Sequence, residues 1–435
     1  MIVWSIIDGV PCRSSGYLVP HTPYPVPHTA HLIIKTLFLH SYSNNMIRIE
    51  EAYKLVSDAV ELMGTEKLDI RECLHRVLAE DIISDVDMPP FDKSAMDGYA
   101  CREEDLDKAM KVIETIPAGK APEKKVLPVQ CSEIMTGAPL PEGANCVIKV
   151  EDTRLDASGS VIFKGKRGKS NIAYQAEDVA KGDILIHKGT FIEPQHIAIL
   201  AATGYSHPEV AVKPKVAIIS TGDEIVEPDQ QPGISKIRNS NAYQLIGQVQ
   251  KCGAEADYIG IAQDTEQESY EIIDEAFKEH DVVMLTGGIS MGQFDFIPKV
   301  FEKLGVEVLF KTLAVQPGKP TLFGKLGEKR IFGLPGNPVS AFNTFELLVR
   351  PYLRLSMGGE TGWSIVRLAM GADYKRKKSD RDSFIPVKIE EGKVYPGVYH
   401  GSGHIQALTN ADGFIMVPYG TTQLEEGASI DVRQI

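Results

Sequence analysis

A strand, a turn of small residues and a helix follow one another over residues 281–304. The turn reads Thr286-Gly-Gly-Ile-Ser-Met-Gly292 and lies between an apolar run and a helical pattern. Gly287, Gly288 and Ser290 leave backbone N–H groups open to an anion, and the helix start adds the positive end of its dipole. This arrangement predicts a binding site for a phosphate or another oxyanion, whereas the alternative is an ordinary tight turn of an α/β fold.

Acidic residues follow the ends of three predicted strands in the same part of the chain. Asp223 and Glu224 follow the first strand, Asp264 follows the second, and Asp295 lies at the end of the glycine turn. Strand ends of a parallel sheet meet at one edge, so these acids can face one crevice. A carboxylate beside a phosphate is unfavourable unless a cation lies between them, and oxygen ligands suit a hard cation. The acids together therefore predict a nucleotide-like ligand with Mg²⁺, whereas each acid alone is typical of a turn or a helix cap.

Composition limits the kind of partner and the compartment. The 435 residues include 59 acidic and 46 basic side chains, and the net charge of −13 argues against nucleic acid or an anionic membrane as a partner. The six cysteines form no C-x-x-C pair and indicate neither a disulfide framework nor a zinc site, so a reducing cytoplasm is expected. A single core rarely exceeds roughly 250–300 residues, so the chain should contain several domains.

The residue pattern changes along the chain and divides it into parts. Residues 1–45 contain five prolines and four histidines without helical or strand periodicity, so we expect a disordered or non-native extension. Amphipathic patterns over 46–63, 69–81 and 194–205 predict helices that pack together. The expected domains are a discontinuous helical N-terminal domain at 46–85 and 183–211, an inserted mostly-β domain at 86–182, an α/β domain at 212–361 and a C-terminal β barrel at 362–435.

Six strand-like runs alternate with four helical patterns in the α/β region. Such alternation predicts a mostly parallel, doubly wound sheet with helices on both faces, which binds ligands beyond the carboxyl ends of its strands. The expected strands are 215–220, 257–261, 281–285, 306–310, 321–324 and 330–334. The expected helices are 241–251, 267–278, 296–304 and 339–355.

Two further turns have the residues of an anion site. Asn337 precedes a helical pattern that has Ser340 in its first turn, which predicts a second anion site or simply an ordinary helix start. Lys319 lies in the stiff turn Pro317-Gly-Lys-Pro320, which would direct its ammonium group toward an anion, whereas a solvated lysine is the alternative. The run 165–170 lacks the first glycine of a P-loop, and no zinc-hydrolase or acyl-serine motif is present.

Six motifs occur in order along the chain: Pro90-Phe-Asp-Lys-Ser-Ala-Met-Asp-Gly-Tyr-Ala100, Met135-Thr-Gly-Ala-Pro139, Ser220-Thr-Gly-Asp-Glu224, Thr286-Gly-Gly-Ile-Ser-Met-Gly292, Pro317-Gly-Lys-Pro320 and Gly333-Leu-Pro-Gly-Asn-Pro-Val-Ser340. From about Met46 to the C-terminus the chain resembles the molybdopterin molybdenumtransferase family, which includes MoeA and the gephyrin E domain. The resemblance implies a four-part subunit and a homodimer whose active cleft lies between subunits. It also implies insertion of molybdate, or tungstate, into adenylylated molybdopterin with release of AMP, helped by Mg²⁺.

The resemblance also assigns roles to residues. The β-region positions that face the cleft across the dimer match Asp97, Thr136 and Asp178. The acids around the adenylyl phosphate and Mg²⁺ match Glu224, Asp264 and Asp295, and the phosphate turn matches Gly287, Gly288 and Ser290. The positions that hold the molybdate oxyanion match Lys319, Ser340, Arg381 and Ser402, of which Arg381 and Ser402 depend on resemblance alone. The chain departs from the family at Gln316, where a lysine is frequent, so the oxyanion pocket has one cation fewer.

Two other functions stay open at this point. The adenylyltransferase of the same pathway shares the α/β domain type and the Gly-Gly turn, but it would not need the β insertion or the C-terminal barrel. A scaffold or binding module is the other alternative, as the likeness to gephyrin permits. The pathway adenylyltransferase is also a candidate partner of this chain.

Overall fold

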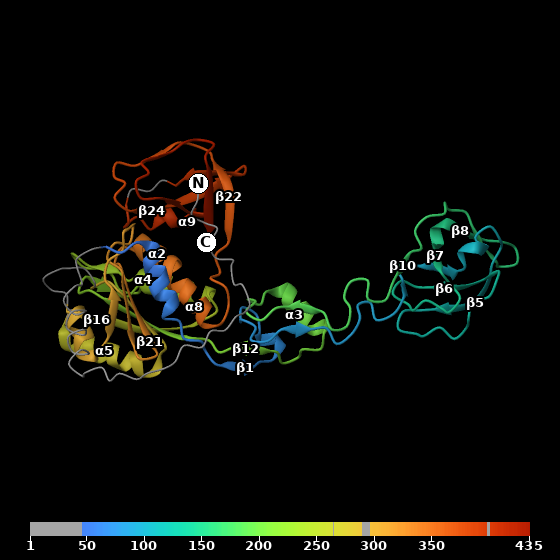
Figure 1. Cartoon of the computed structure of the whole chain (residues 1–435), viewed down its shortest axis with the longest axis horizontal. Helices are drawn as coiled ribbons and strands as arrows, with labels where there is room; N and C mark the ends of the chain where they lie inside the picture. The colour runs from blue at the N-terminus through green and yellow to red at the C-terminus, as the bar shows by residue number, and fades with distance from the viewer. Residues whose placement is uncertain (1–45, 264, 289–295, 398–400) are drawn as a thin grey trace, which may run out of the picture. The chain divides into compact units, whose positions relative to one another are not determined.

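The computed structural model describes residues 46–263, 265–288, 296–397 and 401–435 (Figure 1). The expected extension at 1–45 and the predicted site residues Asp264, Ser290 and Asp295 lie outside these ranges. Within the described ranges, no helix has both the length and the apolar character that crossing a membrane requires.

A six-stranded sheet forms the core of the α/β region, in the order β16-β13-β17-β21-β20-β18. The first four strands are parallel, whereas β20 is antiparallel to both of its neighbours. The strands are β13 Lys215–Thr221, β16 Glu255–Ala262, β17 Val282–Thr286, β18 Glu307–Phe310, β20 Leu322–Leu326 and β21 Lys329–Leu334. The six predicted strands and the mostly parallel sheet are therefore confirmed.

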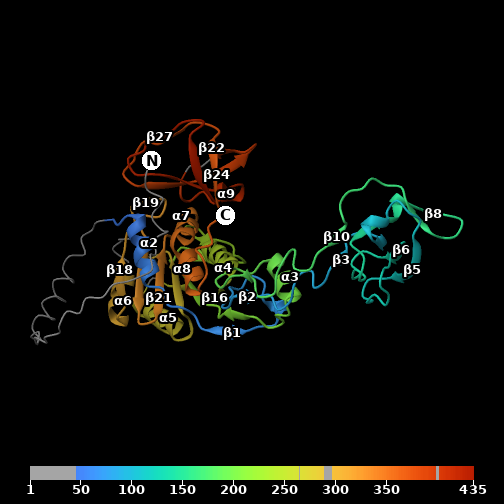
Figure 2. The same ribbon diagram turned by 45° about the vertical axis from the view of Figure 1, so that its right-hand side comes forward.

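Helices cover both faces of this sheet (Figures 1 and 2). One face packs against α4 Asn241–Lys251, α7 Pro338–Thr344, the π-helical turn Phe345–Val349 and α8 Arg350–Ser356, and the other against α5 Glu266–Glu279 and α6 Ile297–Leu304. Successive side chains of β13 alternate between the two cores: Val216 and Ile218 face one, and Ala217 and Ile219 face the other. This burial on both faces explains why the strands read as continuous apolar runs.

The first helix, α2 Ile49–Asp58, is part of the α/β core. Its residues Ile49, Ala52 and Val56 are buried in the same cluster as Val216. Arg330 on β21 also donates through Nε to the carbonyl oxygen of Ala59 at 2.6 Å. The prediction that this helix packs with the helix at 194–205 is therefore wrong, because its apolar face is covered by the sheet domain.

The predicted helix over 69–81 is also wrong. The structure has a single 3₁₀ turn, Ile70–Glu72, and His75 then adopts φ +64°, which a helix does not allow. Leu78 donates its N–H to the carbonyl oxygen of Thr190 at 2.9 Å and accepts from Gly189. The apolar spacing resembles that of a helix, but the backbone pairs with a segment more than one hundred residues later.

Strand pairs connect the two halves of the expected N-terminal domain. β1 Thr65–Lys67 pairs with β12 Glu209–Ala211, and β2 Ile82–Ile83 pairs with β11 Ile184–Ile186. The helix α3 Pro194–Ala202 contributes Leu200 to a core shared with Cys73, Leu78 and Val210. These contacts support the proposed discontinuous domain, whose two halves are joined by short strand pairs and by the helix α3.

The inserted region is a small β structure. Its main sheet has the order β5-β6-β4-β7, made of β4 Gly98–Cys101, β5 Lys111–Ile116, β6 Gln130–Ile134 and β7 Cys146–Lys149. Two strand pairs accompany it: β3 Lys93–Ser94 with β10 Ile172–Ala173, and β8 Thr153–Leu155 with β9 Val161–Phe163. These strands agree with the mostly-β insertion that the sequence predicts for residues 86–182.

Five strands close into a barrel near the C-terminus, in the order β24-β25-β22-β28-β26 and back to β24. They are β22 Ile365–Met370, β24 Asp382–Glu390, β25 Lys393–Pro396, β26 Gly413–Val417 and β28 Ser429–Gln434. The short pair β23 Tyr374–Lys375 and β27 Gln423–Leu424 and the helix α9 Gln406–Thr409 complete it. The predicted C-terminal β barrel is confirmed. A short strand from the α/β region, β19 Val315–Gln316, pairs in parallel with β24.

Candidate functional site

The carboxyl ends of β13 and β17 enclose the glycine turn. In the sheet, β16 lies on one side of β13 and β17 lies on its other side. The order of the strands therefore reverses between β13 and β17, and these two strands form the topological switch point. Gly287 and Gly288 have φ of +90° and +56°. A Cβ atom on Gly287 would lie 2.3 Å from the carbonyl oxygen of Thr221, and one on Gly288 would lie 2.3 Å from Thr221 Oγ1. Both the conformation and the contact therefore require glycine.

Buried polar side chains support this turn. The Asn241 amide at the start of α4 donates through Nδ2 to Thr286 Oγ1 at 2.9 Å and to the carbonyl oxygen of Gly336 at 2.8 Å. This one amide therefore connects the ends of β17 and β21. Thr221 is 3% exposed, and its Oγ1 has no hydrogen-bond partner among the described residues. A buried hydroxyl without a partner is unfavourable, so this atom fits a polar ligand at the turn.

The acids of the predicted cation site are described only in part. Asp223 and Glu224 are exposed directly after β13, and Lys236 donates to the carbonyl oxygen of Asp223. Asp264 and Asp295 lie outside the described ranges, so their approach to Glu224 stays a prediction. Within those ranges, no three His, Cys, Asp or Glu side chains group closely enough to hold a metal ion. Glu224 contributes carboxylate oxygens, which are the donors that Mg²⁺ prefers.

The start of α7 joins two of the predicted oxyanion residues. Asn337 precedes the helix and donates through Nδ2 to Ser402 Oγ at 2.8 Å, while the Val339 N–H donates to the carbonyl oxygen of Ser402 at 3.1 Å. Ser340 lies in the first helical turn and is 3% exposed. The structure thus brings Ser340 and Ser402 to the same helix start, although they belong to different predicted domains.

Lys319 follows β19 and Arg381 precedes β24, and these two strands pair with each other. Lys319 is exposed beyond β19, and its turn is held against α7 because Asn343 donates through Nδ2 to the carbonyl oxygen of Pro317 at 3.0 Å. Arg381 comes directly before β24, which pairs with β19. Its nearest acid is Asp380, at 3.8 Å from Nε. Both cations therefore lie next to this strand pair, and no contact between them is seen in the described chain.

The β region also brings two predicted residues together. Asp97 Oδ1 accepts hydrogen bonds from the Thr136 backbone N–H at 2.7 Å and from Thr136 Oγ1 at 2.8 Å. The backbone bond, followed by the hydroxyl bond, lowers the pKa of Asp97. Asp178 is exposed, and its N–H donates to the carbonyl oxygen of Met88. Among the described contacts, none joins the Asp178 side chain to the Asp97–Thr136 pair.

Two residues of this arrangement, Thr221 and Asn241, were not among the predicted site residues, and Asn337 was predicted only as the residue before the helix of the second anion site. Thr221 and Asn337 lie inside the motifs quoted above, and Asn241 begins a predicted helix. All three are polar residues at a strand end or a helix start, which is the signal that identifies them. Their partners, however, are decided by the tertiary structure.

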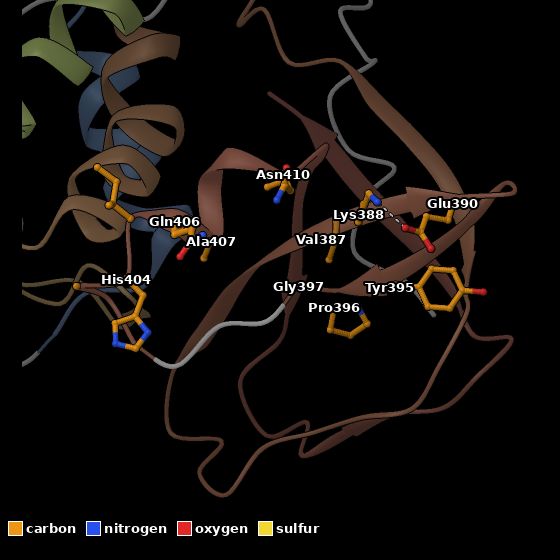
Figure 3. Close-up of a pocket in the computed structure, with 13 residues that line it drawn as sticks. Val387, Lys388, Glu390, Tyr395, Pro396, Gly397, His404, Gln406, Ala407 and Asn410 are labelled. Atoms are coloured by element: carbon orange, nitrogen blue, oxygen red, sulfur yellow. Dashed lines mark hydrogen bonds and ion pairs between the residues drawn. The ribbon is translucent and has the colours of Figure 1, made fainter.

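A cavity of about 900 Å³ lies in the C-terminal domain, between strands β24 and β25 and residues 403–411 (Figure 3). Val387 and Tyr395 line it from the strands, and His404 and Gln406 line it from the other side. None of the predicted site residues in the described ranges lines this cavity. The lining residue nearest to one of them in the chain is Gly403, which follows Ser402. Its size alone does not make it the site.

Three family models match successive parts of the chain. The MoeA N-terminal region (domain I and II) matches residues 47–204, a probable molybdopterin binding domain matches 217–355, and the MoeA C-terminal region (domain IV) matches 369–435. These three matches together extend over almost all of the described chain.

Similar proteins cover nearly the same range. The molybdopterin molybdenumtransferase of Bacillus subtilis is 36% identical over 404 residues, which cover 89% of this chain and 94% of that protein. The Staphylococcus epidermidis protein of the same name is 34% identical over 398 residues, which cover 89% of this chain and 95% of that protein. A solved structure of the molybdopterin biosynthesis protein MoeA from Pyrococcus horikoshii has a TM-score of 0.77 and 32% identity, and the match covers 90% of this chain and all of that one.

Proposed function

The chain belongs to the molybdopterin molybdenumtransferase family, and we propose that it inserts molybdate, or tungstate, into adenylylated molybdopterin with Mg²⁺-dependent release of AMP. The family membership makes it a transferase of molybdenum cofactor biosynthesis. Beyond this family membership, we propose the identity of the substrates, of the metal ion and of the released nucleotide.

The observation that carries this proposal is the glycine turn at the β13–β17 switch point. Gly287 and Gly288 pack directly against Thr221, where a Cβ atom would clash, and this contact holds the turn at the strand end. The Gly287 N–H donates to the carbonyl oxygen of Leu334 at 3.2 Å, so a ligand phosphate would meet the backbone that follows Gly287. The Thr221 hydroxyl, which has no hydrogen-bond partner among the described residues, adds a polar atom at the same turn. We assign the adenylyl phosphate to this position.

The oxyanion is assigned to the residues next to the start of α7. Lys319 and Arg381 supply positive charge, and Ser340 and Ser402 supply hydroxyl donors. Replacing one molybdate oxo group by the two dithiolene sulfurs forms two Mo–S bonds, and the displaced oxygen leaves as water with the two thiol protons. A water molecule is consumed when the phosphoanhydride bond is cleaved to release AMP, so no protein nucleophile is required.

A hard cation fits the donors that the sequence places beside the glycine turn. Glu224, with Asp264 and Asp295, would hold Mg²⁺ through carboxylate oxygens. When bound, the ion neutralises charge on the phosphate of the leaving AMP. The chain's own part in that step is to hold the acids and the glycine turn at neighbouring strand ends.

The homodimer and the cytoplasmic location belong to the same proposal. The exposed Asp97–Thr136 pair and the exposed Asp178 offer polar groups suited to a cleft completed by a second subunit. The adenylyltransferase of the pathway would supply the adenylylated substrate, because its product carries the phosphoanhydride that this enzyme cleaves.

The test is an assay with purified chain, adenylylated molybdopterin, molybdate and Mg²⁺. We expect AMP release that requires molybdate and Mg²⁺, with molybdenum bound to the product. Competition between molybdate and tungstate then shows which anion is preferred. Turnover that requires ATP and unmodified molybdopterin would identify an adenylyltransferase, and partner binding without turnover would identify a scaffold.

A further inference from the structure

A second cavity, of about 780 Å³, opens beside the start of α4. The two-stranded pair β14 Ile225–Val226 and β15 Ile237–Arg238 brings its walls together. The walls include the carboxylates of Glu227 and Asp229, the Arg238 side chain, Asn239, and the rings of Tyr243 and Tyr258. None of these residues has a role in the proposed reaction so far.

The two tyrosines are held by one carboxylate. Tyr258 donates its hydroxyl to Glu227 Oε1 at 2.6 Å, and Tyr243 donates its hydroxyl to Glu227 Oε2 at 3.1 Å. Desolvation, followed by the hydrogen bond to Glu227, raises the pKa of Tyr243, so its hydroxyl stays a donor at neutral pH. The rings lie 5.6 Å apart at 45°, and Tyr243 is 46% exposed. Tyr243 therefore offers an open aromatic face whose orientation is fixed before any ligand binds.

This cavity is connected to the glycine turn through residues 239–241, which lie just before and at the start of α4. Asn239 donates through Nδ2 to Tyr258 Oη at 2.9 Å and to Ser220 Oγ at 3.0 Å, at the end of β13. Two residues later, Asn241 holds the ends of β17 and β21. The same short segment thus lines the cavity and supports the turn that is assigned to the phosphate.

We infer that Tyr243 is the stacking surface for the adenine ring of the adenylylated substrate. This inference rests on the proposed function, because it extends the nucleotide from the phosphate at Gly287–Gly288 into the neighbouring cavity. A base is planar and uncharged, so it stacks on an open tyrosine face. The lining has two carboxylates, Glu227 and Asp229, against one guanidinium, Arg238, so its net charge is negative; this disfavours a second phosphate and does not oppose an uncharged nucleoside. The geometry therefore suits the base end of the nucleotide.

Isothermal titration of the full chain with AMP and with ribose 5-phosphate tests this assignment, since the second probe lacks the base. We expect Tyr243→Ala to weaken AMP binding about tenfold and to leave ribose 5-phosphate binding unchanged. Tyr243→Phe keeps the ring and should stay within about twofold of the original affinity, and Tyr243→Trp should bind AMP at least as tightly. Tyr419→Ala is the matched control, because Tyr419 is 57% exposed and lies in the C-terminal domain.

The inference is wrong if Tyr243→Ala binds AMP as the unaltered chain does, or if the unaltered chain binds AMP no better than ribose 5-phosphate. The AMP affinity should rise with the area of the ring from Ala through Phe to Trp, and a folding defect in one variant would not produce this trend. The molybdate-dependent AMP release assay separates the two proposals. Turnover by the unaltered chain with AMP binding independent of Tyr243 overturns only this assignment, whereas absence of turnover overturns the proposed function.

Discussion

The strand ends of the α/β sheet and the polar motifs of the inserted β region hold their polar residues in opposite ways. At the sheet, Thr221 is 3% exposed and Asn241 is 8% exposed, and contacts from three strands hold the glycine turn. In the β region, Asp97 and Thr136 bond mainly to each other and are exposed. The first arrangement is held by contacts within the subunit. The second is open on its exposed side, where the proposed cleft between subunits would place an opposing surface.

The largest effect should follow from closing the glycine turn. Gly288 and Gly327 both have φ +56°, but a Cβ atom on Gly288 would lie 2.3 Å from Thr221 Oγ1, whereas one on Gly327 meets nothing within 4 Å. We expect Gly288→Ala to lower AMP affinity more than about a hundredfold and to cost about 1–3 kcal/mol more stability than Gly327→Ala. Urea unfolding and AMP titration measure both quantities. Equal losses of AMP affinity and of stability in the two variants would contradict the close contact between Gly288 and Thr221.

The next prediction tests whether the exposed β-region pair completes a site on another subunit. Asp97→Asn and Asp295→Asn homodimers should each be nearly inactive. A mixture of the two should recover about a quarter of the original turnover, because half of the dimers are mixed and each of these has one intact site of two. Purified heterodimers, each with one intact site of two, should show about half of the original turnover in an AMP-release assay. No recovery would mean that Asp97 and Asp295 act together in a site within one subunit.

Removing the Lys319 ammonium should affect one ligand and leave the other unchanged. The loss of a charge-assisted hydrogen bond predicts that Lys319→Ala weakens molybdate binding about tenfold to a hundredfold. AMP binding should be unchanged, because the glycine turn does not include this residue. Lys311→Ala is the control, since Lys311 is also exposed and only eight residues earlier. Equal weakening of both ligands by Lys319→Ala would contradict the assignment of separate positions for phosphate and oxyanion.

The smallest effect concerns the hydrogen bonds within the β-region pair. Thr136→Val removes the hydroxyl donor and keeps the backbone N–H, so the pKa of Asp97 should rise toward the ordinary aspartate value of about 3.9. Because the folded-state pKa of Asp97 is lowered, its stabilising contribution is present above the unfolded value and is lost as pH falls through the folded value. The stability difference between the two proteins should therefore shrink as pH falls below about 4, and it should disappear once pH is below the lowered pKa of Asp97 in the unaltered chain.

Carboxyl carbon NMR titration measures this pKa directly. Thr115→Val is the control, because Thr115 donates its hydroxyl to Glu133 Oε2 at 2.7 Å in the same region. It should leave the titration of Asp97 unchanged. An unshifted Asp97 in Thr136→Val would mean that the backbone bond alone sets its pKa.

Much of the α/β fold could be predicted from the sequence. The helix expected at 241–251 coincides with α4 Asn241–Lys251, and the strands agree within one or two residues at most ends. Buried apolar runs and amphipathic helices depend on neighbours in the chain, so their patterns are readable. The pattern at 69–81 was misleading for the same reason, because its apolar spacing matches a helix while its backbone pairs with residues 189–209.

The sequence by itself determined the strands and helices of the α/β region and the small residues of the turn that follows Thr286. Only the tertiary structure decided which distant groups meet at them. Ser402 lies 65 residues from Asn337, and its hydrogen bond depends on how the barrel packs against α7. Tyr243 and Tyr258 share Glu227 because a loop from β13 folds over the start of α4. Side-chain hydrogen bonds between distant segments depend on how buried faces pack, and no local period in the chain records that packing.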